Sequence, residues 1–206
     1  ERITQKNIDD LTINLGDQIL VEVPEKRYFE FSSSEYMTVN KDYNFVISVS
    51  PDNNTLLLGN KYSSDGVSPK GKGLSISNRT ENGWEIPKDV EIQNFQNVNK
   101  YVGYFLANDN KYLIMSVKRT DEGEGKTDLY VSFLNEEGIW SKPKNLGNTV
   151  NSFEDETNPF LASDGKTLYF ASKGFNSMGG YDIFKSVYDE ENKIWGKPKN
   201  MEFPIN

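Results

Sequence analysis

The chain has 206 residues, of which 35% are hydrophobic and 13% aromatic, enough for a sizeable core in one domain or in part of a larger one. Its 31 acidic residues outnumber the 23 basic ones, and the formal net charge of -8 makes nucleic acid and anionic lipid poor partners. The chain contains no cysteine and no histidine. It therefore lacks disulfides, thiolate metal sites, cysteine nucleophiles and the commonest general base, which disfavours most enzyme classes.

No apolar run approaches the roughly 18 residues of a membrane-spanning helix. The N-terminal sequence Glu-Arg-Ile-Thr does not show the signal-peptide pattern of basic and then apolar residues. We therefore expect a soluble segment without a membrane span, with any targeting sequence outside it.

The first part of the chain, residues 1–42, differs from the rest. Residues 19–23 and 28–31 are rich in apolar and β-branched or aromatic side chains, which predicts two strands. We expect this part to be a divergent N-terminal region that closes a preceding repeat.

From residue 43 onward, the same order of strand and turn signals occurs three times. Period-two alternation and β-branched or aromatic residues favour strands, and turn residues interrupt any helical pattern within about ten positions. The predicted strands are 45–49, 55–58, 74–78 and 84–86 in the first unit, 102–106, 112–117, 129–134 and 139–140 in the second, and 159–162, 167–171, 182–188 and 194–195 in the third.

Two landmarks share one period of about 55 residues, which is the length of a four-stranded β-propeller blade. An Asp-containing turn lies between the first and second strands of each unit, and a tryptophan followed three residues later by proline marks the fourth. We therefore predict an all-β fold, a propeller or partial propeller of four-stranded antiparallel blades. The blades span about residues 43–97, 98–152 and 153–206, and their tryptophans are Trp84, Trp140 and Trp195.

Three blades are fewer than the roughly four to eight of closed propellers. We expect a larger parent protein or an assembly between chains, with a small four-bladed ring as the alternative.

The third unit carries the motifs Ser-Asp-Gly-Lys-Thr-Leu-Tyr-Phe at 163–170 and Gly-Gly-Tyr-Asp-Ile-Phe at 179–184, after Asn-Leu-Gly-Asn-Thr-Val-Asn-Ser at 145–152. It resembles the WD-like propeller repeat of TolB-type periplasmic proteins, over residues 43–203. It is also similar to repeats in multidomain envelope proteins of Gram-negative bacteria that carry an OmpA-like, peptidoglycan-binding domain. The first unit departs from the pattern, with Lys-Gly-Lys-Gly-Leu at 70–74, and the second keeps only Thr-Asp-Leu-Tyr at 127–130.

The resemblance implies a periplasmic or outer-membrane-associated protein that acts as a non-enzymatic scaffold. Its partner would be a protein of the cell envelope, in a secretion, motility or peptidoglycan-associated assembly. The alternative is a carbohydrate-binding or glycosidase-type propeller, which as an enzyme needs two carboxylates about 5 to 10 Å apart.

Most of the conspicuous polar residues are predicted to be structural. Asp109, Asp164 and Gly165 suit hairpin turns, in which Asp caps turn amides and Gly adopts positive φ. Asp182 precedes a strand, where its carboxylate accepts hydrogen bonds from loop amides near Gly179 and Gly180. The three tryptophans are expected to anchor neighbouring sheets.

Two residues are candidates for a binding site. Glu156 and Asn158 enter the first strand of the third unit, which in propellers lines the central channel. The acidic stretches 154–156 and 121–124 offer oxygen ligands of the kind that calcium accepts, although neither has EF-hand spacing. We expect no cofactor, with calcium as the one alternative that stays open.

Overall fold

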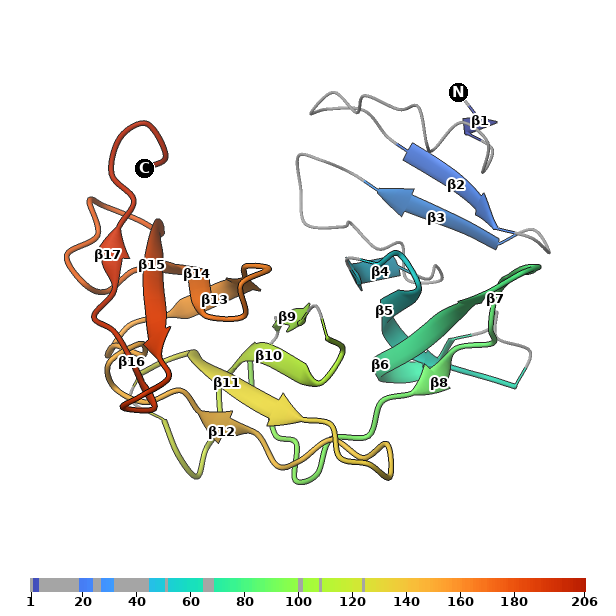
Figure 1. Ribbon diagram of the computed structural model, residues 1–206, viewed down its shortest axis with the longest axis horizontal. Helices are drawn as coiled ribbons and strands as arrows, with labels where there is room; N and C mark the ends of the chain where they lie inside the picture. The colour runs from blue at the N-terminus through green and yellow to red at the C-terminus, as the bar shows by residue number, and fades with distance from the viewer. Residues whose placement is uncertain are drawn as a thin grey trace. The chain divides into compact units, whose positions relative to one another are not determined.

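The computed structural model describes residues 2–3, 19–23, 27–31, 45–50, 52–64, 69–99, 102–107, 109–123 and 125–206 (Figure 1). All regular structure in these ranges is β-strand, which confirms the all-β prediction. Most of the predicted N-terminal region 1–42 lies outside the described residues. In the part of the chain described here, no helix is long and apolar enough to cross a bilayer.

The chain divides into two compact units, residues 1–90 and 91–206. The first unit contains a small N-terminal sheet, in which β1 and β2 are parallel and β2 and β3 antiparallel. It also contains an antiparallel sheet, the first sheet, in the order β4-β5-β6-β7, with β8 also paired to β6. The strands are β1 (Arg2–Ile3), β2 (Ile19–Val23), β3 (Arg27–Phe31), β4 (Phe45–Val49), β5 (Thr55–Tyr62), β6 (Pro69–Thr80), β7 (Gly83–Trp84) and β8 (Lys88–Asp89).

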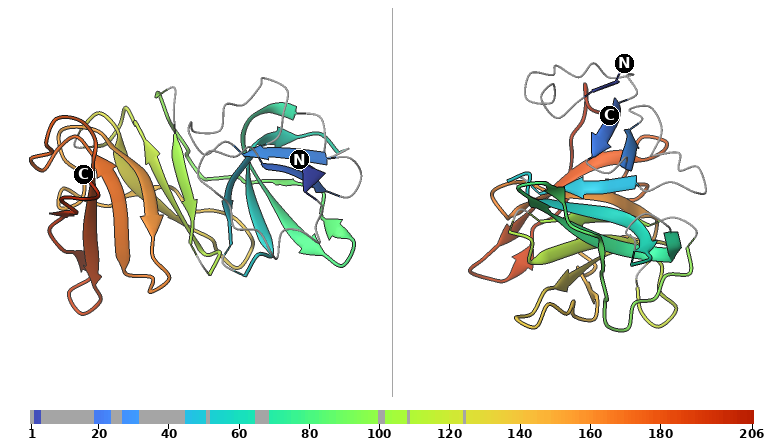
Figure 2. Two further views of the ribbon diagram at one scale, coloured as in Figure 1. Left: turned by 90° about the horizontal axis from the view of Figure 1, so that it is seen from above. Right: turned by 90° about the vertical axis from the view of Figure 1, so that its right-hand side faces the viewer.

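The second unit contains two further antiparallel sheets whose strands follow one another in chain order. Figure 2, left, shows these strands side by side, in green to red. The second sheet consists of β9 (Gly103–Leu106), β10 (Tyr112–Val117), β11 (Asp128–Phe133) and β12 (Lys144–Asn145). The third consists of β13 (Glu156–Leu161), β14 (Thr167–Ser172), β15 (Asp182–Asp189), β16 (Ile194–Trp195) and β17 (Lys199–Asn200).

In the first and third sheets the fourth strand is broken into two short pieces, whereas in the second sheet the predicted strand 139–140 is not formed and Trp140 makes only isolated bridges ahead of β12. In the third sheet, Trp195 pairs with Tyr188, and Asn200 further along pairs with Phe184. Pro198 lies between the two pieces, and a proline has no backbone N–H to donate to the neighbouring strand. The tryptophan motif therefore marks only the first piece, and the second was not predicted from the sequence.

The first sheet departs from the prediction in its central hairpin, where β5 and β6 continue beyond the expected strands. Residues 70–73, which lie between the predicted strands 55–58 and 74–78, are part of β6, and the pairing shifts register between Gly59 and Tyr62. Gly71 and Gly73 have φ of 153° and 158°, and a Cβ on Gly73 would meet the side chain of Lys61. Glycine therefore permits an irregular strand here rather than a loop.

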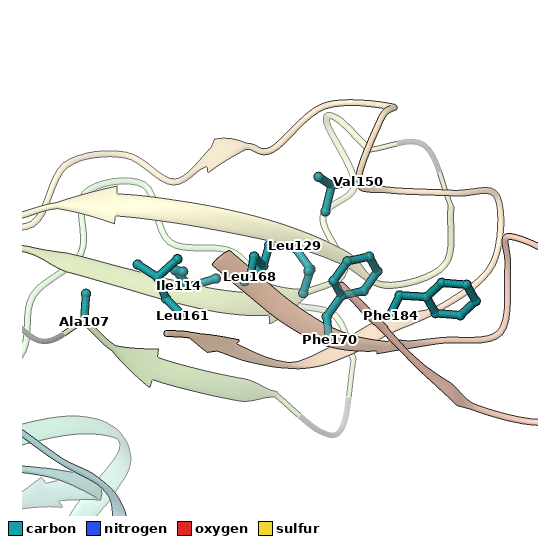
Figure 3. Close-up of a cluster of buried hydrophobic side chains, with 8 residues drawn as sticks. All are labelled: Ala107, Ile114, Leu129, Val150, Leu161, Leu168, Phe170 and Phe184. Carbon is teal, nitrogen blue, oxygen red and sulfur yellow. The ribbon is translucent and has the colours of Figure 1, made fainter. Parts of the chain in front are cut away.

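The core of the second unit lies between its two sheets. Phe170 and Phe184 from the third sheet stack with ring centroids 6.1 Å apart. Leu129 and Val150 from the other side are fully buried against them (Figure 3). The complete cluster is Ala107, Ile114, Leu129, Val150, Leu161, Leu168, Phe170 and Phe184.

Val150 and Ile205 provide a matched pair for measuring this packing. Each precedes an asparagine at the same point after its sheet, but Val150 is fully buried and Ile205 is 58% exposed. We expect Val150→Ala to lower the free energy of unfolding by about 2 kcal/mol, because it removes two buried methyl groups and leaves a cavity. Ile205→Ala should change it by less than about 0.5 kcal/mol. Urea unfolding of both variants checks this, and equal losses would contradict the packing described.

Candidate interaction surface

The strand order places four connections at one end of the second and third sheets: those before β11, β13 and β15, and the segment after β17. We call this the loop end. Three of these connections touch one another. A Cβ atom added to Gly125, before β11, would lie 2.4 Å from the carbonyl oxygen of Ser152, before β13. A Cβ atom added to Gly174, before β15, would lie 2.7 Å from the Cβ of Ser152. Glycine at both places therefore lets the flanking loops pack directly on the link between the sheets.

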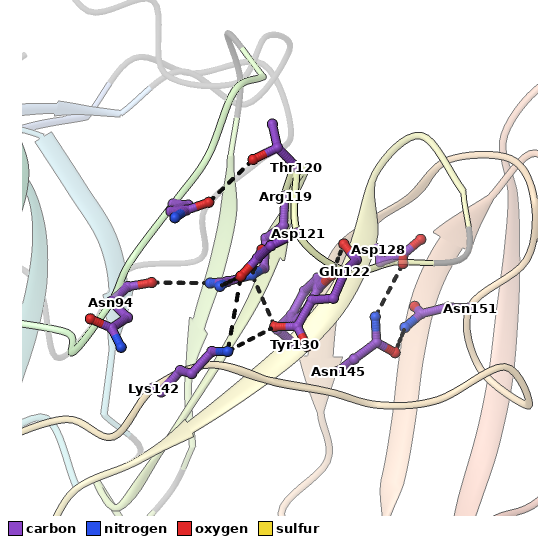
Figure 4. Close-up of polar contacts among 11 residues, drawn as sticks. Asn94, Arg119, Thr120, Asp121, Glu122, Asp128, Tyr130, Lys142, Asn145 and Asn151 are labelled. Carbon is purple, nitrogen blue, oxygen red and sulfur yellow. Dashed lines mark hydrogen bonds and ion pairs between the residues drawn. The ribbon is translucent and has the colours of Figure 1, made fainter.

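A chain of side-chain hydrogen bonds fixes the loop end of the second sheet (Figure 4). Asn145 donates to Asp128 at 3.1 Å, and Asn151 donates to Asn145 at 2.8 Å. Asn151 also accepts from the amide of Leu129 at 2.7 Å and donates to the carbonyl oxygen of the same residue at 3.0 Å. We call Asp128, Asn145 and Asn151 the clasp of the second sheet.

The third sheet has the same arrangement. Asn200 donates to Asp182 at 2.8 Å, and Asn206 donates to Asn200 at 2.6 Å. Asn206 accepts from the amide of Ile183 at 2.7 Å and donates to its carbonyl oxygen at 3.0 Å. Asp182, Asn200 and Asn206 are thus the clasp of the third sheet.

The first sheet has different residues at the corresponding places. In the second sheet, Asn145 pairs with the residue two positions after Asp128. In the first sheet, Asp89 pairs with Ser75, which lies two positions after Gly73. Asp89 therefore takes the place of the first clasp asparagine, and Gly73 that of the clasp aspartate. Asp89 forms an ion pair with Lys61 at 3.8 Å instead.

Glu156, a candidate binding residue, lies inside the molecule at the start of β13. Its side chain is fully buried and accepts from the hydroxyls of Ser152 and Ser172, both at 2.6 Å, and from the amide of Ser152 at 2.8 Å. Burial raises the pKa of this carboxyl above its ordinary value of 4.5. Glu156 therefore ties the third sheet to the link that precedes it.

Asn158, the other candidate, is exposed, and its φ of 51° lies in the left-handed region. It lies where the pairing of β13 with β14 shifts register between Thr157 and Phe160. The structure thus places Glu156 in the interior and Asn158 at a strand irregularity.

The loop aspartate Asp182 accepts from the amide of Met178 at 2.9 Å, beside Gly179 and Gly180. Gly179 has a φ of 131°, in the region that favours glycine.

The turn residues lie at the opposite end of the sheets. Asp164 accepts from the amides of Lys166 and Thr167 at 2.9 and 2.8 Å and from the hydroxyl of Thr167 at 2.7 Å. These bonds, led by the Thr167 hydroxyl, lower the pKa of Asp164 to about 2. Gly165 follows with a φ of 69°, and in the preceding unit Asp109 accepts from the amide of Lys111 at 3.0 Å.

Trp140 is buried, and Trp84 and Trp195 are half-buried. Trp195 lies against the cluster between the second and third sheets. Trp84 packs against the cluster of Val46, Leu56, Leu58 and Tyr62.

The acidic loop before β11 surrounds a buried arginine (Figure 4). Arg119 donates to both carboxylate oxygens of Asp121, at 3.0 and 2.8 Å, and lies 3.0 Å from Glu122. The bond from Arg119 lowers the pKa of Asp121. Glu124 lies outside the described residues; within the described ranges, no group of three carboxylates is arranged to hold a metal ion.

The outer surface of the loop end carries large apolar side chains. Phe153 is 82% exposed, Met178 70% and Tyr181 48%. Lys173 lies over the ring of Tyr181 at 4.5 Å and pairs with Asp155 at 3.3 Å. We call Phe153, Met178 and Tyr181 the loop surface.

A scan of the sequence against protein-family models and a search of curated proteins found no match.

Asn151 tests the clasp of the second sheet. Asn151→Ala should lower the free energy of unfolding by about 3 kcal/mol, because it removes several hydrogen bonds and leaves buried polar groups unpaired. Asn148, exposed on the same connection, is the matched control, and Asn148→Ala should cost less than about 0.5 kcal/mol. Urea denaturation measures both, and equal effects would show that the clasp adds nothing.

Glu156 should give the protein a characteristic pH dependence. Because the folded-state pKa is raised, the folded protein binds this proton more tightly, so its stability falls as the pH rises from about 4.5 through the folded-state pKa. Glu156→Gln cannot titrate. The stability of the wild type minus that of Glu156→Gln should therefore decrease across that window, as measured by urea unfolding at a series of pH values. A difference that increases with pH would contradict the burial of an ionisable Glu156.

Proposed function

We propose that this protein is a non-enzymatic protein-interaction scaffold, and that it binds its partner through the loop surface. The observation that carries the proposal is the exposure of Phe153, Met178 and Tyr181 on loops that touch one another. Large apolar and aromatic side chains beside charged residues are typical of the energetically dominant centres of protein interfaces.

Preorganisation supports the same function. The connections that carry Phe153 and Met178 are tied down by the buried carboxylates of Glu156 and Asp182. A loop that is already ordered loses less conformational entropy when it binds, which improves affinity.

The use of the acidic residues favours a scaffold over a glycosidase. The carboxylates of Asp128, Glu156 and Asp182 all accept hydrogen bonds from groups of the protein itself. A glycosidase needs two carboxylates that are free to reach a sugar in one pocket. These three residues serve the structure instead.

We further propose that the first, second and third sheets are blades of a β-propeller of the TolB type. The repeated strand order, the split fourth strand and the packing of the third sheet face to face on the second support this architecture. The resemblance of residues 145–184 to TolB-type repeats supports a location in the periplasm or at the outer membrane. The partner is then a protein of the cell envelope, in an assembly linked to peptidoglycan, secretion or motility.

Site-specific photo-cross-linking tests this function. A benzophenone amino acid at position 153 should cross-link one defined protein in an envelope fraction of the source bacterium. The same group at position 139, which is exposed on the hairpin after β11, is the matched control and should not cross-link that protein.

Further results separate protein binding through the loop surface from its alternatives. Combined Met178→Ser and Tyr181→Ser substitutions should abolish the cross-link from position 153 without lowering the melting temperature, because both side chains are largely exposed. Equal cross-linking from both positions would contradict the proposal. Binding of the purified chain to protein-free peptidoglycan or to oligosaccharides, lost in the double variant, would favour carbohydrate recognition instead.

A further inference from the structure

The backbone of Trp195 points out of the third sheet at its outer edge. In an antiparallel pair of strands, opposite residues are hydrogen-bonded to each other only at every second position. Trp195 lies opposite Tyr188, and the bond beside this pair runs from the amide of Gly196 to the carbonyl oxygen of Val187 at 2.8 Å. Trp195 therefore occupies a position that is not hydrogen-bonded to β15, and its own N–H and C=O groups point away from the sheet.

In the second sheet, the chain itself covers the corresponding edge at Trp140. The amide of Trp140 donates to the carbonyl oxygen of Glu91 at 3.3 Å, and the amide of Gln93 donates to the carbonyl oxygen of Trp140 at 3.0 Å. Ile92, between these two residues, pairs with Trp140 in parallel orientation. Residues 91–93 thus add a short parallel strand to this edge.

In the third sheet, the same edge is open. Among the residues that the structure describes, none forms a hydrogen bond with the N–H or the C=O group of Trp195. Trp140 is 2% exposed, whereas Trp195 is only half-buried. The preceding residues follow the same order, since Ile139 is 37% exposed and Ile194 58%.

The link between the second and third sheets has a conformation that leaves this edge open. The carbonyl oxygen of Gly147 accepts from the amides of Val150 and Asn151 at 3.1 and 2.9 Å, so the link turns there. The turn brings Asn151 into the clasp of the second sheet. The link is therefore committed to the clasp and does not extend along Trp195.

From these observations we infer that the edge at Trp195 binds an extended segment of a partner protein by β-strand addition. The segment runs parallel to β16, accepts from the N–H group of Trp195 and donates to its C=O group. It carries a β-branched apolar residue in the place of Ile92, because residues directly opposite each other lie on the same face of a sheet and contact each other. This edge is separate from the loop surface, so neither proposal depends on the other.

The test uses a peptide with the sequence of residues 90–94, Val-Glu-Ile-Gln-Asn, with both ends blocked. Two backbone hydrogen bonds and one apolar side chain predict a dissociation constant on the order of 1 mM. With peptide at about tenfold above that constant, the amide hydrogen of Trp195 should exchange at least about fivefold more slowly than in the free chain, as measured by NMR.

Two controls accompany the measurement. The amide of Trp140 already donates to Glu91, so its exchange rate should change by less than about 1.5-fold when the peptide is added. A peptide N-methylated on its glutamine lacks the N–H group that donates to the carbonyl oxygen of Trp195. It should likewise leave the exchange of Trp195 within about 1.5-fold of the free chain.

Three outcomes would overturn the inference. One is exchange at Trp195 that the peptide does not slow, or that the N-methylated peptide slows equally. Another is a Trp195 amide that exchanges as slowly as that of Trp140 in the free monomer, which would mean that the chain covers its own edge. The third is slowing that grows with protein concentration, together with a dimer in sedimentation velocity, which would assign the edge to a second copy.

Discussion

Face-to-face packing of successive sheets is the constraint on which the rest of the second unit depends. The strand β10 illustrates it, because the consecutive residues Leu113, Ile114 and Met115 are all buried although neighbouring side chains point to opposite faces. A strand of this kind is stable only when both faces of its sheet are covered. The cluster between the second and third sheets, which includes Leu129 and Phe184, covers one of those faces.

This packing buries backbone and side-chain polar groups at the loop end, and each of them needs a hydrogen-bond partner. The clasps and Glu156 provide these partners. The side-chain oxygens of the asparagines and carboxylates accept hydrogen bonds from backbone N–H groups. These bonds replace the strand pairing that is lost where the chain leaves the sheet. The same bonds that complete the core thus also hold the loops that present Phe153 and Met178. Stability and the proposed binding surface have a common origin in this arrangement.

Much of this architecture could be predicted from the sequence, because its strongest signals are local and repeat. The tryptophan and aspartate landmarks located the three sheets, and the strand 112–117 coincides with β10. The clasps were missed, although Asn145 and Asn151 have the same spacing as Asn200 and Asn206, since asparagine in a loop is usually interpreted as a turn residue. Glu156 was predicted to line a channel. Only the three-dimensional placement of Ser152 and Ser172 shows the partners of its carboxylate. The second pieces of the fourth strands were missed because two-residue strands carry no periodic signal.

Amide hydrogen exchange of the free chain shows whether the loop end is rigid before any partner binds. The amides of Leu129, Ser152, Met178 and Ile183 donate to side-chain oxygens of Asn151, Glu156, Asp182 and Asn206. These four amides should exchange as slowly as amides in the adjoining strands, because the loops open only together with the sheets. Exchange at the rate of an unstructured peptide, with the strands still protected, would show that the loop end is mobile before binding and that the clasps and Glu156 do not order it.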